Sequence, residues 1–158
     1  MKAMKAIILV EDNPHDAELA LTTFQELNLA NEVIVLNDGM EVLDYLYCRG
    51  KYERRTGGHP AVILLDLNMP KMSGVEVLRA IKNDEYLRAI PIVMLTSSRE
   101  ERDLADCYKM GTNAYVVKPV DFQQFVQVMK HLGRFWALVN EQPQCQPVFA
   151  AHTRERTP

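Results

Sequence analysis

Short apolar runs alternate with amphipathic segments along this chain, and the alternation repeats five times. The apolar runs are continuous, which is typical of parallel strands that are buried on both faces of a sheet. We therefore expect five strands, at residues 6–10, 32–36, 61–65, 91–95 and 114–117.

The segments between these runs carry the signals of helices. Asn13 and Pro14 supply an N-cap and a proline suited to the first helical position. Further capping patterns, in which Ser or Asp is followed three residues later by Glu or Gln, begin at Asp38, Ser73, Ser98 and Asp121. Five strand–helix units in succession predict an α/β fold, a doubly wound parallel five-stranded sheet with helices on both faces.

The length of the chain predicts one domain. At 158 residues it has the size of a single domain, which we expect to span residues 1–140. The sequence then turns polar and is interrupted by proline, so we expect residues 141–158 to form a flexible tail without an output domain. Val148 and Phe149 are a candidate docking point within that tail.

The net charge and the cysteine spacing indicate which partners and which cellular compartment to expect. The formal net charge of −3 gives no bulk attraction to nucleic acid or to an anionic membrane. No apolar stretch approaches the length of a membrane span. Cys48, Cys107 and Cys145 lie far apart without metal-binding spacing, which indicates reduced thiols. We expect a cytoplasmic protein that binds neither nucleic acid nor membrane.

Polar residues follow four of the five expected strands at the point where each strand ends. Glu11 and Asp12 follow the first strand, Asp66 the third, Thr96 the fourth and Lys118 the fifth. In a parallel sheet these ends meet at one edge, where ligands bind. Crowded carboxylates repel one another unless a cation joins them, and hard oxygen ligands favour Mg²⁺.

This set of residues points to phosphoryl chemistry. Asp66 is placed to attack a phosphoryl group as a carboxylate nucleophile, with Mg²⁺ neutralising charge on that group. Lys118 adds a positive charge, and the Thr96 hydroxyl offers a hydrogen bond to a phosphoryl oxygen. Each residue alone is ordinary, as a helix cap, a surface lysine or strand filler. The combination at four strand ends carries the interpretation.

Five motifs, in order along the chain, resemble the receiver domain of response regulators. They are Val-Glu-Asp-Asn-Pro at 10–14, Leu-Asp-Leu-Asn-Met-Pro at 65–70, Ser-Gly at 73–74, Leu-Thr-Ser at 95–97 and Tyr-Val-Val-Lys-Pro at 115–119. The resemblance covers about residues 5–140. It implies the flavodoxin-like (βα)5 fold. It also implies that Asp66 accepts a phosphoryl group from a histidine kinase or a phosphotransfer protein.

The same resemblance assigns the metal ligands. Asp12, Asp66 and the backbone carbonyl of Asn68 would hold Mg²⁺, for which Mn²⁺ or Ca²⁺ substitutes in crystals, and Glu11 would act through water. Lys118 would pair with the phosphoryl group. The Lys118–Pro119 peptide bond would be cis.

The resemblance further assigns a switch and its timing. Thr96 and Tyr115 match the switch pair, in which the threonine hydroxyl moves toward the phosphoryl group and the aromatic ring turns into the vacated space. The face of the fourth helix, fifth strand and fifth helix then changes shape. Asn68 and Ser98 occupy the positions that tune phosphoryl lifetime, and neither is a strong base.

Two finer features resemble the stand-alone regulators that partner phytochrome-type kinases, which commonly form dimers. One is the extended segment at residues 47–52, and the other is the pair Phe135 and Trp136 on a long final helix. Adjacent helical positions point about 100° apart, so the two rings are not expected to face one core. At least one is a candidate for a homodimer or partner surface.

Three functions from different classes compete. The first is a signalling switch that catalyses only its own phosphorylation and dephosphorylation and turns over no substrate. The second is a phosphohydrolase of the haloacid-dehalogenase type, which wants an aspartate two residues after the nucleophile, where Asn68 stands. The third is a phosphorylation-independent interaction scaffold, against which the intact set of Asp12, Asp66, Thr96 and Lys118 argues.

Overall fold

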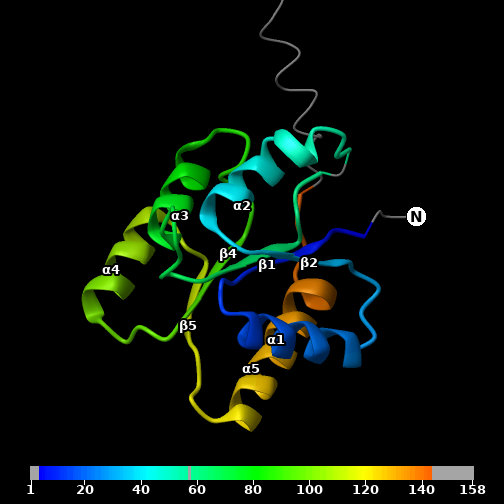
Figure 1. The fold of residues 1–158 in the computed structure, drawn as a ribbon, viewed down its shortest axis with the longest axis vertical. Helices are drawn as coiled ribbons and strands as arrows, with labels where there is room; N and C mark the ends of the chain where they lie inside the picture. Colours follow the sequence, from blue (N-terminus) through cyan, green and yellow to red (C-terminus); the bar gives the residue numbers. More distant parts are fainter. Residues whose placement is uncertain (1–3, 57, 144–158) are drawn as a thin grey trace, which may run out of the picture.

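The computed structural model describes residues 4–56 and 58–143 and contains one parallel five-stranded sheet (Figure 1). The strand order is β2-β1-β3-β4-β5, and every neighbouring pair is parallel. The strands are β1 (Ile7–Val10), β2 (Val33–Leu36), β3 (Val62–Leu65), β4 (Ile92–Thr96) and β5 (Ala114–Val117). The predicted doubly wound α/β fold is thereby confirmed.

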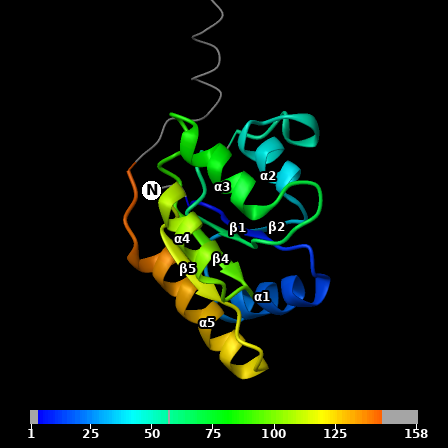
Figure 2. The ribbon, with the colours of Figure 1, turned by 90° about the vertical axis from the view of Figure 1, so that its left-hand side faces the viewer.

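The helices cover both faces of this sheet, as Figures 1 and 2 show. They are α1 (Pro14–Glu26), α2 (Gly39–Leu46), α3 (Gly74–Asn83), α4 (Glu101–Met110) and α5 (Phe122–Arg134). Two short helical segments, η1 (Gly50–Tyr52) and η2 (Phe135–Val139), follow α2 and α5. Helices α1 and α5 pack on one face, whereas α2, α3 and α4 supply the core of the other.

The sheet separates two hydrophobic cores. Side chains alternate across a strand, so Ile8 and Val10 of β1 join the core under α2 and α3, while Ile7 and Leu9 join the core under α1 and α5. All four are at most 2% exposed. Burial on both faces explains why the strands appear in the sequence as continuous apolar runs.

Capping residues determine where the helices begin. The Ser73 capping box is complete, with both the Ser73 and the Glu76 side chains bonded to backbone amides. The predicted capping box at Ser98 is wrong, because α4 begins at Glu101 and Glu100 is its N-cap. The Ser98 hydroxyl instead donates to Asp103 Oδ2 at 2.5 Å. The Ser98 Oγ also accepts from Glu100 N at 3.3 Å, so it bonds to the amide of the N-cap residue and not to an amide of the first helical turn.

Residue 142, at the start of the tail expected at 141–158, is hydrogen-bonded to its neighbours. Gln142 Nε2 donates to the Ala61 carbonyl at 2.6 Å, and Lys5 Nζ donates to Gln142 Oε1 at 3.0 Å. Residue 142 is therefore held against the start of β3 by amide and ammonium hydrogen bonds that the composition does not reveal. The rest of the expected tail, with Cys145, Val148 and Phe149, lies outside the described residues. Within the described ranges, no helix combines the length and apolar character needed to cross a membrane.

Candidate functional site

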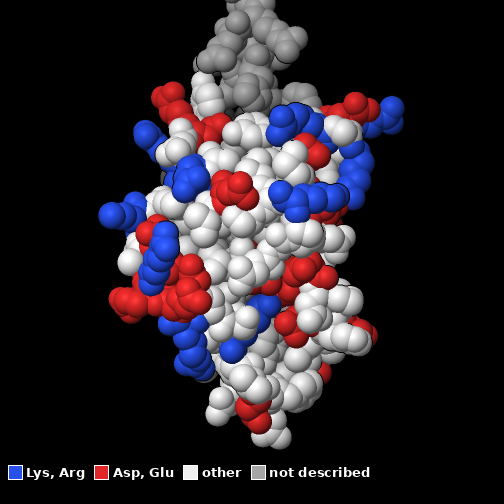
Figure 3. Space-filling model, turned by 60° about the vertical axis from the view of Figure 1, so that its left-hand side comes forward, with Lys and Arg blue, Asp and Glu red and all other residues white. Residues whose placement is uncertain are grey.

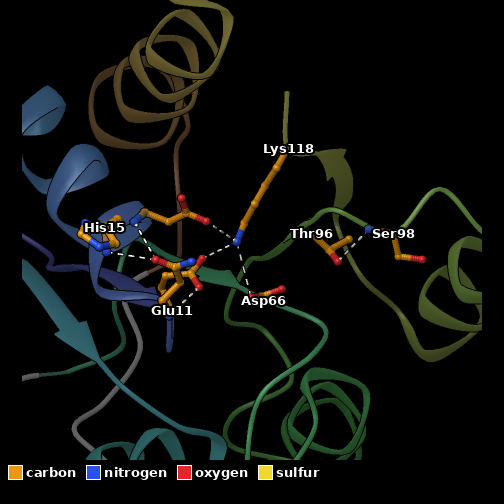
Figure 4. Close-up of polar contacts among 8 residues, drawn as sticks. Glu11, His15, Asp66, Thr96, Ser98 and Lys118 are labelled. Carbon is orange, nitrogen blue, oxygen red and sulfur yellow. Dashed lines mark hydrogen bonds and ion pairs between the residues drawn. The ribbon is translucent and has the colours of Figure 1, made fainter. Parts of the chain in front are cut away.

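The ends of β1, β3, β4 and β5 bring the predicted polar residues to one edge of the sheet. The parallel ladder sets their level: Asp66 N donates to the Val10 carbonyl at 3.1 Å, and Lys118 N donates to the Thr96 carbonyl at 2.7 Å. The side chains of Glu11, Asp66, Thr96 and Lys118 therefore lie near one another, as Figure 4 shows.

Three of these side chains are suited to a divalent cation. Glu11, Asp12 and Asp66 each offer a carboxylate oxygen, and these oxygens all lie within 4.8 Å of one another. Glu11 and Asp66 are buried, whereas Asp12 is exposed to solvent. Hard carboxylate oxygens with access to water are the donor set that Mg²⁺ prefers, so these residues fit the expected cation.

Lys118 supplies the positive charge of the site. Its Nζ donates to Glu11 Oε2 and lies 3.4 Å from both Asp66 Oδ2 and Asp16 Oδ2. Burial lowers the pKa of Lys118, but the hydrogen bond to Glu11 and the charges of Asp66, Glu11 and Asp16 outweigh it, so the pKa is raised. Lys118 is therefore an ammonium group beside Asp66 at neutral pH.

Glu11 is the most buried carboxylate of the site. Burial raises its pKa to about 7, although Lys118 and the Asn13 amide, which donates to Glu11 Oε1 at 3.0 Å, lower it. A carboxylate with a raised pKa binds a cation in competition with a proton. Cation binding at this site should therefore weaken as pH falls below neutrality.

Thr96 and Ser98 lie beside the acidic cluster, as Figure 4 shows, and Tyr115 is hydrogen-bonded to Ser98. Thr96 is fully buried, and its Oγ1 accepts a hydrogen bond from Ser98 N at 3.2 Å. The Tyr115 hydroxyl donates to the Ser98 carbonyl at 3.1 Å. The two residues of the expected switch pair thus both bond to the backbone of Ser98.

Gly74 has a structural role that the motif alone did not reveal. Its amide donates to the Leu67 carbonyl at 2.8 Å, which closes the loop after Asp66. A Cβ atom at residue 74 would overlap the backbone carbonyl of Asp66. Only glycine leaves the Asp66 backbone undisturbed. Asn68, which lies in the same loop, is exposed.

The expected cis peptide bond at Lys118–Pro119 is not present. Among the residues that the structure describes, no peptide bond is cis. The trans form of an X–Pro bond is favoured by about 0.5–1 kcal/mol, so surrounding contacts must impose a cis form.

The structure separates the roles of the two aromatic residues after α5. Trp136 packs against the core under α1 and α5, whereas Phe135 is 45% exposed. Their rings contact edge to face, with centroids 4.9 Å apart. Phe135 is therefore the surface candidate of the pair.

Sequence reasoning missed Asp16 as a neighbour of Lys118. The position lies in the first turn of α1, only four residues after Asp12. An acidic residue there is also the ordinary choice for a helix N-terminus, so no signal in the sequence separates the two roles.

The fold and this strand-end site define a class of protein. The family model described as the response regulator receiver domain matches residues 7–130. The chain belongs to the response regulator receiver domain family. Its sheet order, β2-β1-β3-β4-β5, is that of the solved response regulators to which it is similar.

Three proteins similar to this chain are themselves response regulators. Response regulator Rcp1 of Synechocystis sp. is 36% identical over 132 residues, which cover 84% of this chain and 88% of Rcp1. The structure of its Mn²⁺-bound form aligns with a TM-score of 0.83, covering 89% of this chain and 99% of Rcp1. The phosphorylated cyanobacterial phytochrome response regulator RcpA is 38% identical, with a TM-score of 0.84 over 90% of this chain and all of RcpA. The bacteriophytochrome response regulator AtBRR is 57% identical, with a TM-score of 0.70 over 88% of this chain and 99% of AtBRR.

Proposed function

We propose that this chain is a single-domain response regulator of a two-component system that accepts a phosphoryl group on Asp66. In this proposal residues 1–140 form the receiver domain, and a histidine kinase or phosphotransfer protein is the donor. The observation that carries the proposal is the convergence of Glu11, Asp12 and Lys118 on Asp66 at the strand ends.

The proposed step transfers a phosphoryl group between two side chains. A carboxylate oxygen of Asp66 attacks the phosphorus, the P–N bond of the donor phosphohistidine breaks, and the imidazole takes up a proton. The Lys118 ammonium offsets negative charge on the phosphoryl oxygens. When bound at Glu11, Asp12, Asp66 and the Asn68 carbonyl, Mg²⁺ would neutralise further charge.

The proposed output is a change of the surface formed by α4, β5 and α5. A phosphoryl group on Asp66 would favour the state in which the Thr96 hydroxyl moves toward it and donates to it. Ser98 N would then lose Thr96 Oγ1 as its acceptor. Tyr115, bonded to the Ser98 carbonyl, would respond to the same movement. Its phenol stays a donor, because burial raises its pKa despite the opposing hydrogen bond with Ser98. Ser98 and Asn68 would govern water access to the phosphoryl group and hence its lifetime.

A phytochrome-type photoreceptor kinase is the proposed donor. RcpA and AtBRR are described as regulators of phytochrome and bacteriophytochrome systems. We also propose a cytoplasmic location and signalling through protein partners. On the face drawn in Figure 3, basic and acidic side chains are interspersed, which suits protein contacts better than a continuous basic patch would.

The experiment that tests the function uses a chemical phosphodonor. The full chain is incubated with acetyl phosphate and Mg²⁺, and Asp66→Asn is treated alongside. We expect one added phosphoryl group by intact mass and by phosphate-affinity electrophoresis, dependent on Mg²⁺ and absent in the variant.

Two negative results together would contradict the proposed function. If folded wild-type protein stays unmodified and also fails to bind beryllofluoride in the presence of Mg²⁺, the switch proposal is wrong. The chain would then act as a phosphorylation-independent scaffold.

A further inference from the structure

Lys118 contacts a carboxylate from outside the strand-end cluster. Asp16, in the first turn of α1, places Oδ2 3.4 Å from Lys118 Nζ, the distance that also separates Nζ from Asp66 Oδ2. The ammonium group therefore lies between the phosphoacceptor and a second aspartate. In Figure 4 the Lys118 side chain reaches from the end of β5 toward carboxylates that come from several elements.

Asp16 differs from the other carboxylates around Lys118 in what a cation does to it. Among the described residues, the acidic group that fits a divalent ion consists of Glu11, Asp12 and Asp66, without Asp16. A bound cation neutralises the strand-end carboxylates and weakens their attraction for Lys118. Asp16 keeps its full charge, so it becomes the main anionic partner of Lys118 when a phosphodonor arrives.

The position of Asp16 is fixed and open to solvent. Its backbone amide donates to Asn13 Oδ1 at 3.3 Å, and the N-terminus of α1 favours a negative charge in its first turn. The side chain is 39% exposed, against 10% for that of Asp66. Asp16 thus presents its charge on the solvent side of the site, where a free donor must enter.

We propose that Asp16 is a positioning residue for Lys118 that lowers the reactivity of this site toward free anionic phosphodonors. It draws the ammonium group away from the incoming phosphoryl oxygens and adds a repulsive charge at the entrance. The proposal rests on the function proposed for Asp66.

The test measures the second-order rate constant for phosphorylation of Asp66 by acetyl phosphate at saturating Mg²⁺. Asp16→Asn removes one charge with little change in volume. We expect its rate constant to rise about threefold to tenfold at low ionic strength, as for a unit charge removed within several ångströms of a dianion. Salt screens exposed charges, so the gain should shrink at high ionic strength.

A second donor and two further variants separate charge from packing. Phosphoramidate carries one fewer net negative charge than acetyl phosphate at neutral pH, so the gain in Asp16→Asn should be smaller with it. Glu18→Gln is the matched control, because Glu18 is exposed on the same helix about 200° around its axis. We expect Glu18→Gln to match wild type, and Asp16→Glu to keep the low rate.

The possible outcomes distinguish this inference from the function on which it rests. If wild type is phosphorylated on Asp66 and Asp16→Asn reacts no faster than Glu18→Gln, the role of Asp16 is refuted and the function stands. A gain that is equal at low and high ionic strength would also refute it, because packing rather than charge would be the cause. If no variant is phosphorylated or binds beryllofluoride, the function and the role of Asp16 fall together.

Discussion

Burial acts in opposite directions on the pKa values of Glu11 and Lys118. Glu11 is the more deeply buried partner of its ion pair with Lys118, and burial raises its pKa to about 7. Lys118 keeps a raised pKa in spite of burial, since three carboxylates face its Nζ. A cation that takes the charge of Glu11 and Asp66 therefore also releases Lys118 for other anions. The pairing of Lys118 with these carboxylates thus offsets the repulsion among them.

Away from the site, Glu41 should make stability depend on acid pH. Burial raises the pKa of Glu41, but hydrogen bonds from the Asn37 amide, Lys51 and Tyr52 lower it by more. The resulting pKa is about 2, below the ordinary 4.5. Because the folded-state pKa is the lower one, this stabilisation is complete above pH 4.5 and is lost as pH falls toward about 2. We expect Glu41→Gln to cost about 1.5–3 kcal/mol at neutral pH.

Urea unfolding at a series of pH values measures this effect. The difference between wild type and Glu41→Gln should shrink from neutral pH toward pH 2–3, while the exposed control Glu53→Gln changes little throughout. A cost for Glu41→Gln that is independent of pH would show that the ionised carboxylate is not the source.

Among the helices α1 to α5, α4 has the fewest buried residues. Cys107 is its single buried residue, whereas α3 buries Gly74, Val77, Leu78 and Ile81. Its N-cap, Glu100, makes no side-chain capping bond. The hydrogen bond from Ser98 to Asp103 is what ties the first turn of α4 to the end of β4. Helix α4 is therefore suited to move when the site changes state.

Hydrogen exchange should reveal this difference between helices. We expect the amides of α4 to exchange faster than those of α3 in the unmodified protein. Ser98→Ala should speed exchange in the first turn of α4 about twofold to tenfold further, corresponding to a lost bond of about 0.5–1.5 kcal/mol. The neighbouring exposed Ser97→Ala serves as the control. Protection in α4 equal to that in α3 would contradict this account.

In the whole molecule, the site and the segment after α5 lie at opposite edges of the sheet. Asp66 follows the end of β3, whereas Gln142 bonds to Ala61, which directly precedes that strand. Within that segment, η2 exposes apolar side chains: Phe135 at 45%, Leu138 at 66% and Val139 at 65%. Contiguous exposed apolar residues of this kind mark interaction surfaces. We propose that a second copy of this chain covers η2.

Sedimentation over a range of concentrations tests the proposed homodimer. Wild type is expected to show a concentration-dependent dimer, and Phe135→Ser with Leu138→Ser should shift it to monomer. Met40→Ser on α2, also an exposed apolar residue, is the matched control and should leave the dimer intact. Monomeric wild type at every concentration would remove the proposal.

The strand-end chemistry could be predicted from the sequence because it depends on one topological fact. Five apolar runs alternating with capped helices define a parallel sheet, and residues that follow parallel strands share an edge. Glu11, Asp12, Asp66, Thr96 and Lys118 therefore had to approach one another. The same pattern fixed the layers of the fold, since runs without polar interruption are buried on both faces.

Tertiary structure decided what depends on competition between partners in space. Ser98 does not cap α4, because the helix begins at Glu101 and the Ser98 hydroxyl instead accepts from Glu100 N and donates to Asp103. Trp136 packs against the core and Phe135 is exposed, since adjacent helical positions point about 100° apart. Asp16 reaches Lys118 because the end of β5 lies beside the first turn of α1. Local patterns determine which residues approach an edge, and only the packed molecule determines which of them touch.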